Sequence, residues 1–396
     1  MKSIILFFLI FLHRLPIGKL FCRIKRSNKI LILKIDAIGD SIIWLDSAKE
    51  YRKTFPNNKL VLCYKKDWED IALQLPYFDE YIPFNQKLFF KSLGYRISFL
   101  RKINQYHYKK AINPTFSRNF FFQDWIMNNL HADEKIGSIG DYNNTNNTIA
   151  KLTDRFDYYN PKLKKIGDRW YTQLLPASDG IKMELTRNAE FIRAYINPEF
   201  RSQIPQLPFA LPKSDLIPLQ DYVVFFMGAS TERRMWDVKN FAVVASQLIE
   251  KYLIVVCGSQ SETILYNKLI EQNLDKTKII NLCGKTNLLE LMSIIQSAQF
   301  LVSNETVASH IAVVTNTPSV CILGGGHYGR FQPYEVENIQ EKEKEALPGI
   351  AYYPMDCFCC NWICKYPLEN GKWRCINAIQ VDTVYKKIEE ILKIQN

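Results

Sequence analysis

The sequence has no apolar run long enough to cross a membrane. The apolar stretch near its start, Ile4–Leu12, has nine residues, whereas a spanning helix needs about 20. No small-x-small cleavage site follows it, so a secretory signal peptide is not favoured. We expect an anchor lying in the membrane interface, although a helix packed on the protein's own surface is an alternative. The cations expected near anionic headgroups are Arg14, Lys19, Arg23, Lys25 and Arg26.

The chain also lacks a long block of lysine or arginine, a zinc-finger spacing and an RNA-recognition signature, which argues against a dedicated nucleic-acid-binding protein. A net charge of +11 and a pI near 9.0 still favour anionic partners. Charge alone does not choose among nucleic acid, anionic lipid and phosphorylated substrates. With 47% hydrophobic and 23% charged residues, the composition is that of a globular protein, and 396 residues suffice for two domains.

Strand-like and helix-like patterns alternate from residue 29 onward, which predicts βαβ units and mostly parallel sheets. The proline-rich sequence SQIPQLPFALPKSDLIP separates two such runs and predicts a linker. The polar sequence DYNNTNNT, residues 141–148, is predicted to form a loop. The predicted divisions are a membrane-associating segment at 1–28, a first α/β domain at 29–203, a linker at 204–220, a second α/β domain at 221–378 and a C-terminal helix at 379–396.

Candidate functional residues follow the predicted strands, where parallel sheets bind ligands. In the first domain the turn DAIGDS holds Gly39 and Asp40, and Asp40 is either a helix N-cap or a carboxylate that faces a cleft. In the second domain, GASTERRMW combines Gly228 with Arg234, a pairing that suits a diphosphate unless the arginine is simply solvated. Glu262 follows the next strand as a ribose acceptor or as a favourable charge at a helix start.

A third strand end of the second domain has the sequence SNETVASHIAVV, in which polar residues precede a short helix. Its donors and acceptors are expected to face the same cleft, because the carboxyl ends of parallel strands meet at one edge of a sheet. Three such strand ends in one domain are stronger evidence for a site than any one of them. The residues of this strand end are Asn304, Glu305, Thr306 and His310.

Taken together, ILILKIDAIGDSIIWLDSAKEYRKTFPNNKLVL, GASTERRMWDVKNFA, CGSQSE and NLCGKTNLLELMSIIQSAQFLVSNETVASHIAVVTNTPSVCILGG resemble glycosyltransferase family 9, the heptosyltransferases of lipopolysaccharide assembly. Their order and spacing follow the family from about residue 29 to the C-terminus. The resemblance implies the GT-B fold, an α/β fold with two Rossmann-like domains facing a central cleft. It also implies a nucleotide-sugar donor held mainly by the second domain, an acceptor on the first, and inversion without a required metal or other cofactor.

Carried over by position, the resemblance makes Asp40 the catalytic base, and it makes Arg234 and Glu262 contacts of the donor diphosphate and ribose. Thr306 and His310 match the family's Asp-Thr-Gly-x-x-His element. This chain departs from the family at Glu305, which replaces Asp, at Val307, which replaces Gly, and at GGGHYGRFQPY, which replaces Gly-Pro-Thr. Further candidates for donor or acceptor contacts are Lys34, Gly39, Gly325, His327 and Arg330, the last two with a structural loop role as the alternative.

Five of the ten cysteines crowd into CFCCNWICKYPLENGKWRC, in a region where several family members are also cysteine-rich. Disulfides are not expected in a reducing cytosol. Two states of this segment stay open: reduced packing cysteines, which we prefer because the spacing is irregular, and a structural metal. The candidate ligands for the metal are Cys357, Cys360, Cys364 and Cys375.

The sequence therefore predicts an inverting glycosyltransferase at the cytoplasmic face of a bacterial membrane. Its expected partners are a nucleotide-sugar donor carrying heptose or another hexose-like sugar, a lipid-linked saccharide acceptor and an anionic membrane surface, with no nucleic acid. Two alternatives are a nucleotide-sugar-binding protein that has lost catalysis and a GT-B-type sugar-nucleotide epimerase. Retention of Asp40 argues against the first, and an epimerase would leave the apolar N-terminal run unexplained.

Overall fold

The computed structural model describes residues 15, 17–20, 25–153 and 161–395, so the apolar run Ile4–Leu12 lies outside the described residues, as do Arg14 and Arg23. No helix within the described ranges is long and apolar enough to cross a membrane. The chain forms two compact units. Unit 1 comprises the described residues up to Gly180 with Thr186–Arg201, and unit 2 comprises Ile181–Leu185 with the chain from Ser202 onward. The five segment boundaries predicted from the sequence stay predictions.

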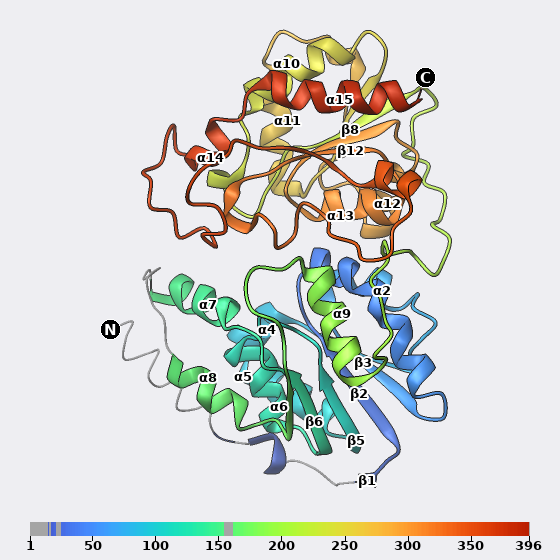
Figure 1. The fold of residues 1–396 in the computed structure, drawn as a ribbon. Helices are drawn as coiled ribbons and strands as arrows, with labels where there is room; N and C mark the ends of the chain where they lie inside the picture. The colour runs from blue at the N-terminus through green and yellow to red at the C-terminus, as the bar shows by residue number, and fades with distance from the viewer. Residues whose placement is uncertain (1–14, 16, 21–24, 154–160, 396) are drawn as a thin grey trace. The chain divides into compact units, whose positions relative to one another are not determined.

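The sheet of unit 1 is parallel, with the order β4-β3-β2-β5-β6-β7 (Figure 1). The chain enters at a central strand, runs to one edge and returns to build the other half, which is the order of a doubly wound Rossmann-like sheet. A short strand, β1 (Lys25–Arg26), pairs with β5 outside this path. The main strands are β2 (Lys29–Lys34), β3 (Lys59–Lys65), β4 (Glu80–Phe84), β5 (Tyr106–Asn113), β6 (Ala132–Ser138) and β7 (Gln173–Leu175).

Alternate residues of these strands pack against helices on opposite faces of the sheet, because successive side chains of a strand point to opposite sides. Leu31 and Leu33 of β2 join a cluster with Phe89, Phe99 and Trp125 from the helices. The helical elements of unit 1 are η1 (Ile17–Leu20), α2 (Ile38–Thr54), η2 (Lys66–Trp68), α3 (Glu69–Ala72), α4 (Gln86–Lys91), α5 (Leu93–Ile103), the π-helical turn η3 (Phe120–Asp124), α6 (Trp125–Asn129), α7 (Asn143–Thr153), α8 (Pro161–Asp168) and α9 (Glu184–Tyr195).

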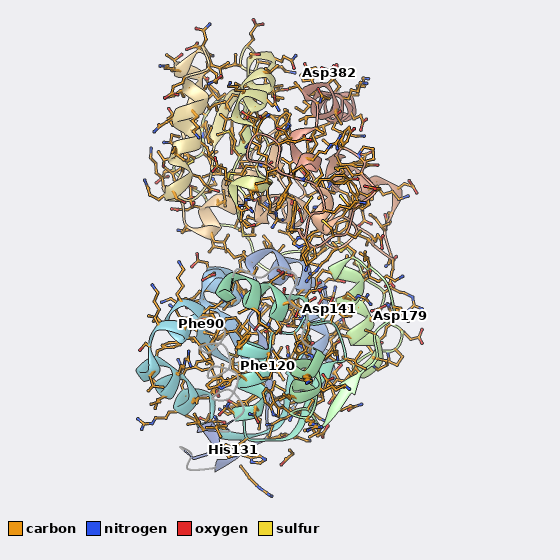
Figure 2. All side chains as sticks on the ribbon, turned by 90° about the vertical axis from the view of Figure 1, so that its left-hand side faces the viewer. Phe90, Phe120, His131, Asp141, Asp179 and Asp382 are labelled. Atoms are coloured by element: carbon orange, nitrogen blue, oxygen red, sulfur yellow. The ribbon has the colours of Figure 1, made fainter. Side chains whose placement is uncertain are left out.

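Helix α7 corrects the prediction of a loop at residues 141–148. Its asparagine-rich sequence has low helix propensity, but tertiary contacts hold it in place. Thr145 accepts a hydrogen bond from the backbone N–H of Phe120 at 2.9 Å, and the Asn119 amide donates to the carbonyl of Asn144 at 2.9 Å. Ile149 is fully buried in a cluster with Phe120, which Figure 2 labels. These partners lie far away in the sequence, so the local pattern could not reveal them.

The sheet of unit 2 repeats the doubly wound order as β10-β9-β8-β11-β12-β13, again parallel throughout. Two Rossmann-like α/β sheets are thus present, as the sequence predicts. The strands of unit 2 are β8 (Tyr222–Phe226), β9 (Leu253–Val256), β10 (Ile279–Asn281), β11 (Phe300–Asn304), β12 (Ser319–Ile322) and β13 (Gly349–Ala351).

Helices cover both faces of this second sheet, with α10, α11 and α15 on one face and α12 and α13 on the other (Figure 1). Helix α15 contacts β12, β13 and α10, so it completes the core of unit 2 through Val384 and Ile388. The helical elements are η4 (Glu232–Arg234), α10 (Val238–Leu248), η5 (Gln260–Glu262), α11 (Thr263–Ile270), η6 (Lys276–Lys278), α12 (Leu288–Gln296), α13 (Val307–Val314), η7 (Gly325–His327), η8 (Glu341–Ala346), α14 (Arg374–Asn377) and α15 (Val381–Gln395).

Candidate functional site

Asp40 lies in the first turn of α2, immediately after the carboxyl end of β2. The N-cap of this helix is Ala37, which makes no side-chain capping bond, so Asp40 is the third helical residue and Gly39 the second. The N-cap interpretation of Asp40 is therefore wrong. A carboxylate in the first turn is still favoured by the helix dipole, and the predicted role of Asp40 as catalytic base stays a prediction.

A buried polar network supports the turn that precedes Asp40. The Lys34 ammonium, fully buried at the end of β2, lies 2.7 Å from Oδ2 of Asp36. The same carboxylate accepts hydrogen bonds from Thr115 at 2.8 Å and from Gln123 at 2.9 Å. Paired and hydrogen-bonded charges are the form in which ionic groups persist inside proteins. The structure thus gives Lys34 a structural partner, while the predicted ligand contact of Lys34 stays a prediction.

In unit 2 the three predicted strand ends come from adjacent strands, because β9, β8 and β11 are neighbours in the sheet. The Glu262 side chain lies directly against Gly228: a Cβ added to Gly228 would meet Oε1 of Glu262 at 1.4 Å. The chain therefore needs glycine here to let Glu262 approach β8. Glu262 also closes a capping box with Ser259 at the start of η5, so it supports the helix start irrespective of any ribose contact.

Asn304 ties two of these strand ends together. Its amide nitrogen donates to the carbonyl oxygen of Met227 at 2.6 Å, and its amide oxygen accepts from the backbone N–H of Trp236 at 3.0 Å. Asn304 is fully buried. Its amide thereby fixes the loop after β8, which carries Arg234, relative to the end of β11.

Arg234 and Glu305 form the charged centre of this edge. Nη2 of Arg234 lies 3.3 Å from Oε2 of Glu305, and Nη1 donates to the Ser230 hydroxyl at 2.8 Å. On the other oxygen of Glu305, Nδ1 of His327 lies at 3.6 Å. Burial raises the pKa of Glu305, but the hydrogen bond from His327 and the charge of Arg234 outweigh it and hold that pKa below its ordinary value. Glu305 is therefore ionised at neutral pH.

An aromatic side chain covers the guanidinium group of Arg234. The Trp362 ring centroid lies 4.1 Å from Cζ of Arg234, within the range of a cation–π contact. The His327 ring meets the same indole edge to face at 5.6 Å, and Nε2 of His327 lies 3.1 Å from Oδ1 of Asn361. Arg234 is thus confined between a carboxylate and an indole.

Thr306 caps α13, and its hydroxyl accepts from the backbone N–H of Ala308 at 3.3 Å. One turn later, His310 is buried, with Nδ1 2.8 Å from the hydroxyl oxygen of Tyr334. Burial lowers the pKa of His310 to about 4, against the opposing charge of Glu305. His310 is therefore neutral near pH 7 and brings a hydrogen-bonding imidazole, not a cation, to this edge.

The three glycines that follow β12 are explained by the cysteine-rich segment that packs on them. A Cβ on Gly325 would meet Phe358 at 2.3 Å, and a Cβ on Gly326 would meet Trp362 at 2.3 Å. The backbone N–H of Cys359 donates to the carbonyl of Gly325 at 2.7 Å, and that of Asn361 donates to Gly326 at 2.9 Å. Gly325 thus has a packing role in the structure, and its predicted ligand contact stays a prediction.

The cysteines of this segment are all reduced in the structure. Cys357, Cys360, Cys364 and Cys375 are free thiols, and within the described ranges no group of three or more His, Cys, Asp or Glu side chains could hold a metal ion. Cys359 instead donates from Sγ to the carbonyl oxygen of Tyr328 at 3.0 Å. Both states that the sequence left open for these four cysteines, packing thiols and a structural metal, stay predictions.

Arg330 lies in the loop after η7, where Nε is 3.8 Å from Oε2 of Glu184. The backbone N–H of Glu184 also donates to the carbonyl of Arg330 at 2.8 Å. Arg330 thus joins this loop to residues 181–185 of the same unit, and its predicted ligand contact stays a prediction. A separate pocket of about 370 Å³ lies at the amino ends of β4 and β5, the sheet edge opposite to the predicted site.

Comparison with known proteins shows what this chain is similar to. Residues 155–348, just under half of the chain, match the model of glycosyltransferase family 9 (heptosyltransferase). The chain is a divergent relative of glycosyltransferase family 9. The lipooligosaccharide heptosyltransferase 2 of Campylobacter jejuni is 25% identical over 166 residues, which cover 40% of this chain and 47% of that protein. Lipopolysaccharide heptosyltransferase 3 of Escherichia coli is 25% identical over 123 residues, covering 31% and 36%.

The chain spans about half the length, or less, of these curated relatives. Solved structures show the same fold over nearly the whole chain. Escherichia coli heptosyltransferase WaaC, solved with ADP-2-deoxy-2-fluoro heptose, is 15% identical, with a TM-score of 0.62 over 91% of this chain and 99% of that one. A family 9 protein of Veillonella parvula is 15% identical, with a TM-score of 0.63 over 93% and 98%.

A third structural neighbour is the iron-containing dodecameric glycosyltransferase TibC from enterotoxigenic Escherichia coli. It is 12% identical, with a TM-score of 0.53 over 95% of this chain and 78% of that one. The GT-B-type α/β fold predicted from the sequence is confirmed by these neighbours.

Sequence reasoning missed the residues that reach the site from the cysteine-rich segment. Trp362 and Asn361 contact Arg234 and His327, and Tyr334 contacts His310. The signal that could have found the first two is the run of three glycines, because consecutive glycines in a loop indicate close approach by another part of the chain. No pattern in the sequence singles out Tyr334.

Proposed function

We propose that the protein is an inverting glycosyltransferase that moves a sugar from a nucleotide-sugar donor to a hydroxyl of a lipid-linked saccharide, as in lipopolysaccharide core assembly. The observation that carries this proposal is Arg234, placed with Ser230 and Glu305 where β8 and β11 end and α13 begins. A cation and a helix N-terminus both stabilise the oxygens of a diphosphate.

In the proposed reaction the acceptor hydroxyl oxygen attacks the anomeric carbon while the bond from that carbon to the diphosphate oxygen breaks. Asp40 takes the hydroxyl proton, and the nucleoside diphosphate leaves with the bonding electrons. Attack from the face opposite the leaving group inverts the anomeric configuration. Arg234 stabilises the negative charge that develops on the departing diphosphate, which is the usual electrostatic contribution to such a step.

The proposed donor site differs from that of its relatives at the sugar end. Glu305, where the family has aspartate, is engaged by Arg234 and His327, so its longer arm takes space beside the diphosphate. We propose heptose or another hexose-like sugar as the transferred group, and the cytoplasmic face of a bacterial membrane as the location of the protein.

The test uses Asp40→Asn, which keeps the shape of the side chain but cannot accept the proton. Transfer should fall by about 10²- to 10⁴-fold, the usual contribution of a general base. Binding of the donor should be unchanged, measured by thermal shift against ADP-, GDP-, UDP-, CMP- and dTDP-sugars, in which a ligand at about 100 times its Kd stabilises by about 2.7 kcal/mol.

Unchanged transfer by this variant would remove Asp40 from the reaction. A wild-type protein that binds a donor but transfers nothing to membrane extracts would instead support a nucleotide-sugar-binding protein without catalysis. Conversion of the free sugar-nucleotide in the absence of any acceptor would support an epimerase.

A further inference from the structure

A surface on unit 1 exposes three large apolar side chains within six residues. Leu88 and Phe90 of α4 are 45% and 37% exposed, and Leu93 at the start of α5 is 71% exposed. We call these three residues, together with Lys87 and Lys91, the α4–α5 patch. Isolated apolar side chains on a surface need no explanation, but a contiguous group of them indicates a binding surface.

The local structure explains why these side chains point outward. Phe89 is fully buried, and its ring packs on Phe84 at 5.3 Å and on Trp125 at 4.9 Å. Because successive residues of a helix differ by about 100° in direction, anchoring Phe89 turns Leu88 and Phe90 to either side of the buried face. Figure 2 labels Phe90, whose ring meets that of Phe122 edge to face, with the ring centroids 4.8 Å apart.

The break between α4 and α5 presents Leu93 as well. The Ser92 side chain accepts a hydrogen bond from the backbone N–H of Tyr95 at 3.1 Å and so caps α5. Leu93 therefore occupies the first position of α5, where the turn leaves it the most exposed of the three.

The sequence that carries the patch has side-chain charges of one sign. Residues 85–103, which include α4 and α5, contain five basic and no acidic side chains. Lys87 and Lys91 are exposed beside the apolar group, and Arg101 and Lys102 are exposed at the other end of α5. An apolar group bordered by cations complements a bilayer whose headgroups are anionic. A second copy of this surface would bring like charges together, which disfavours self-association through the patch.

The short helix η1 lies against the same helix. η1 contacts both α5 and α6, and the backbone N–H of Gly18 donates to Oδ1 of Asn129 at 2.6 Å. In the sequence, four residues separate the apolar run Ile4–Leu12 from η1.

We propose that the α4–α5 patch docks the protein on an anionic lipid bilayer. Leu88, Phe90 and Leu93 enter the interface, and the lysines contact the headgroups. The proposal deepens the function proposed above, on which it rests for the presence of a membrane-bound acceptor. Docking itself requires neither donor nor acceptor.

The experiment measures co-sedimentation of the full chain with vesicles of phosphatidylcholine, alone or with about one-third phosphatidylglycerol. Wild-type protein should bind the anionic vesicles, and added salt should weaken the binding because it screens surface charge. Lys87→Gln with Lys91→Gln should weaken binding about 25-fold, since each lysine near such a surface contributes about fivefold, or about 1 kcal/mol. Leu88→Ser with Leu93→Ser should also abolish most of the binding.

The matched control is Ile264→Ser on α11 of unit 2, where the side chain is 56% exposed outside any patch. It should bind vesicles like wild type. The proposal would be overturned if the patch variants kept wild-type vesicle binding. It would also be overturned if light scattering showed that the patch substitutions only dissociate an oligomer of the protein. If the wild-type protein binds vesicles but transfers no sugar, the docking proposal stands and the proposed function is contradicted.

Discussion

At the residue scale, the position of Arg234 depends on two neighbours of opposite character. Glu305 neutralises its charge, and Trp362 fixes the plane of its guanidinium group. Trp362 is itself held in the left-handed backbone region, with a φ of 63°, which is uncommon for a bulky residue. Such conformations persist where the surrounding structure holds them and tend to occur at functional sites. We therefore regard Trp362 as a positioning residue for Arg234.

Trp362→Ala should weaken binding of a nucleoside diphosphate by about 3- to 30-fold, because a cation–π contact contributes about 0.5–2 kcal/mol and the freed arginine would adopt other rotamers. Trp362→Phe should recover most of the affinity. Isothermal titration with ADP, GDP, UDP and dTDP measures the effect.

The chain offers a matched control in the adjacent arginine. Cζ of Arg233 lies 5.6 Å from the ring of Trp373, so Trp373→Ala removes the same kind of contact from the neighbouring residue. This variant should keep wild-type affinity for the diphosphate. An equal loss in both variants would mean that Trp362 acts only through the folding of its segment.

At the element scale, the cysteine-rich segment and the glycine turn after β12 depend on each other. Gly326 does not have a left-handed backbone, so the constraint on it comes from the nearby indole and not from its own φ. The same segment also carries Trp362 to Arg234. Docking of the segment and the geometry around Arg234 are therefore coupled.

Gly326→Ala should destabilise the protein by about 1–3 kcal/mol, the usual cost of overpacking, because its Cβ would meet Trp362 at 2.3 Å. Combining it with Trp362→Ala should recover part of the loss, since the clashing ring is then absent. Gly94→Ala in α5, where only the Ser92 hydroxyl comes within 4 Å, should stabilise by up to about 1 kcal/mol. Urea unfolding measures all three, and additive effects in the double variant would contradict the proposed clash.

Elements also differ in how far the sequence could predict them. The strands of both sheets have continuous apolar patterns that are visible locally, for example YVVFF in β8. Helix α7 does not, because its stability comes from Asn119, Phe120 and other residues outside its own sequence. The sequence of α7 is polar and has no apolar periodicity, so taken alone it predicts a loop. Hydrogen bonds with residues of η3 and its N-cap hold it as a helix.

At the scale of the whole molecule, the buried charges make stability depend on pH. His310 has a pKa of about 4 when folded, against an ordinary value of 6.5. Between these values the unfolded chain binds a proton that the folded chain does not, so stability falls as the pH is lowered from about 6.5 to about 4. Glu305 has a lowered pKa when folded, so its contribution is present above its ordinary pKa and is lost at still lower pH.

The protein should therefore lose about 3 kcal/mol of unfolding free energy through His310 on acidification across this range. His310→Gln should lack this component, so that its unfolding free energy falls less steeply than that of wild type between pH 7 and pH 4.5. Urea unfolding at a series of pH values measures both slopes. Parallel curves for the two proteins would show that His310 titrates alike in both states.

Some features of the candidate site could be predicted from the sequence, and others needed the structure. Gly228, Glu262, Asn304 and Glu305 could be predicted together, because each follows a strand and adjacent parallel strands end at one edge. The N-cap reading of Asp40 could not be decided locally, because the sequence pattern leaves the start of α2 uncertain by a few residues and the N-cap, Ala37, lies three positions before Asp40. The packing of the cysteine-rich segment on Gly325 and Gly326 could not be predicted locally either.

The sequence by itself determined the two parallel α/β sheets and the edge on which polar residues gather, because side-chain periodicity and strand ends are local properties of the chain. Only the tertiary structure decided the contacts of Arg234 with Trp362, of His310 with Tyr334 and of α7 with η3. Those contacts join residues distant in the sequence, and packing and buried hydrogen bonds select them after the local elements exist. The α4–α5 patch likewise depends on the tertiary structure. The sequence shows only a run of apolar residues, and the burial of Phe89 decides that its neighbours Leu88 and Phe90 are exposed.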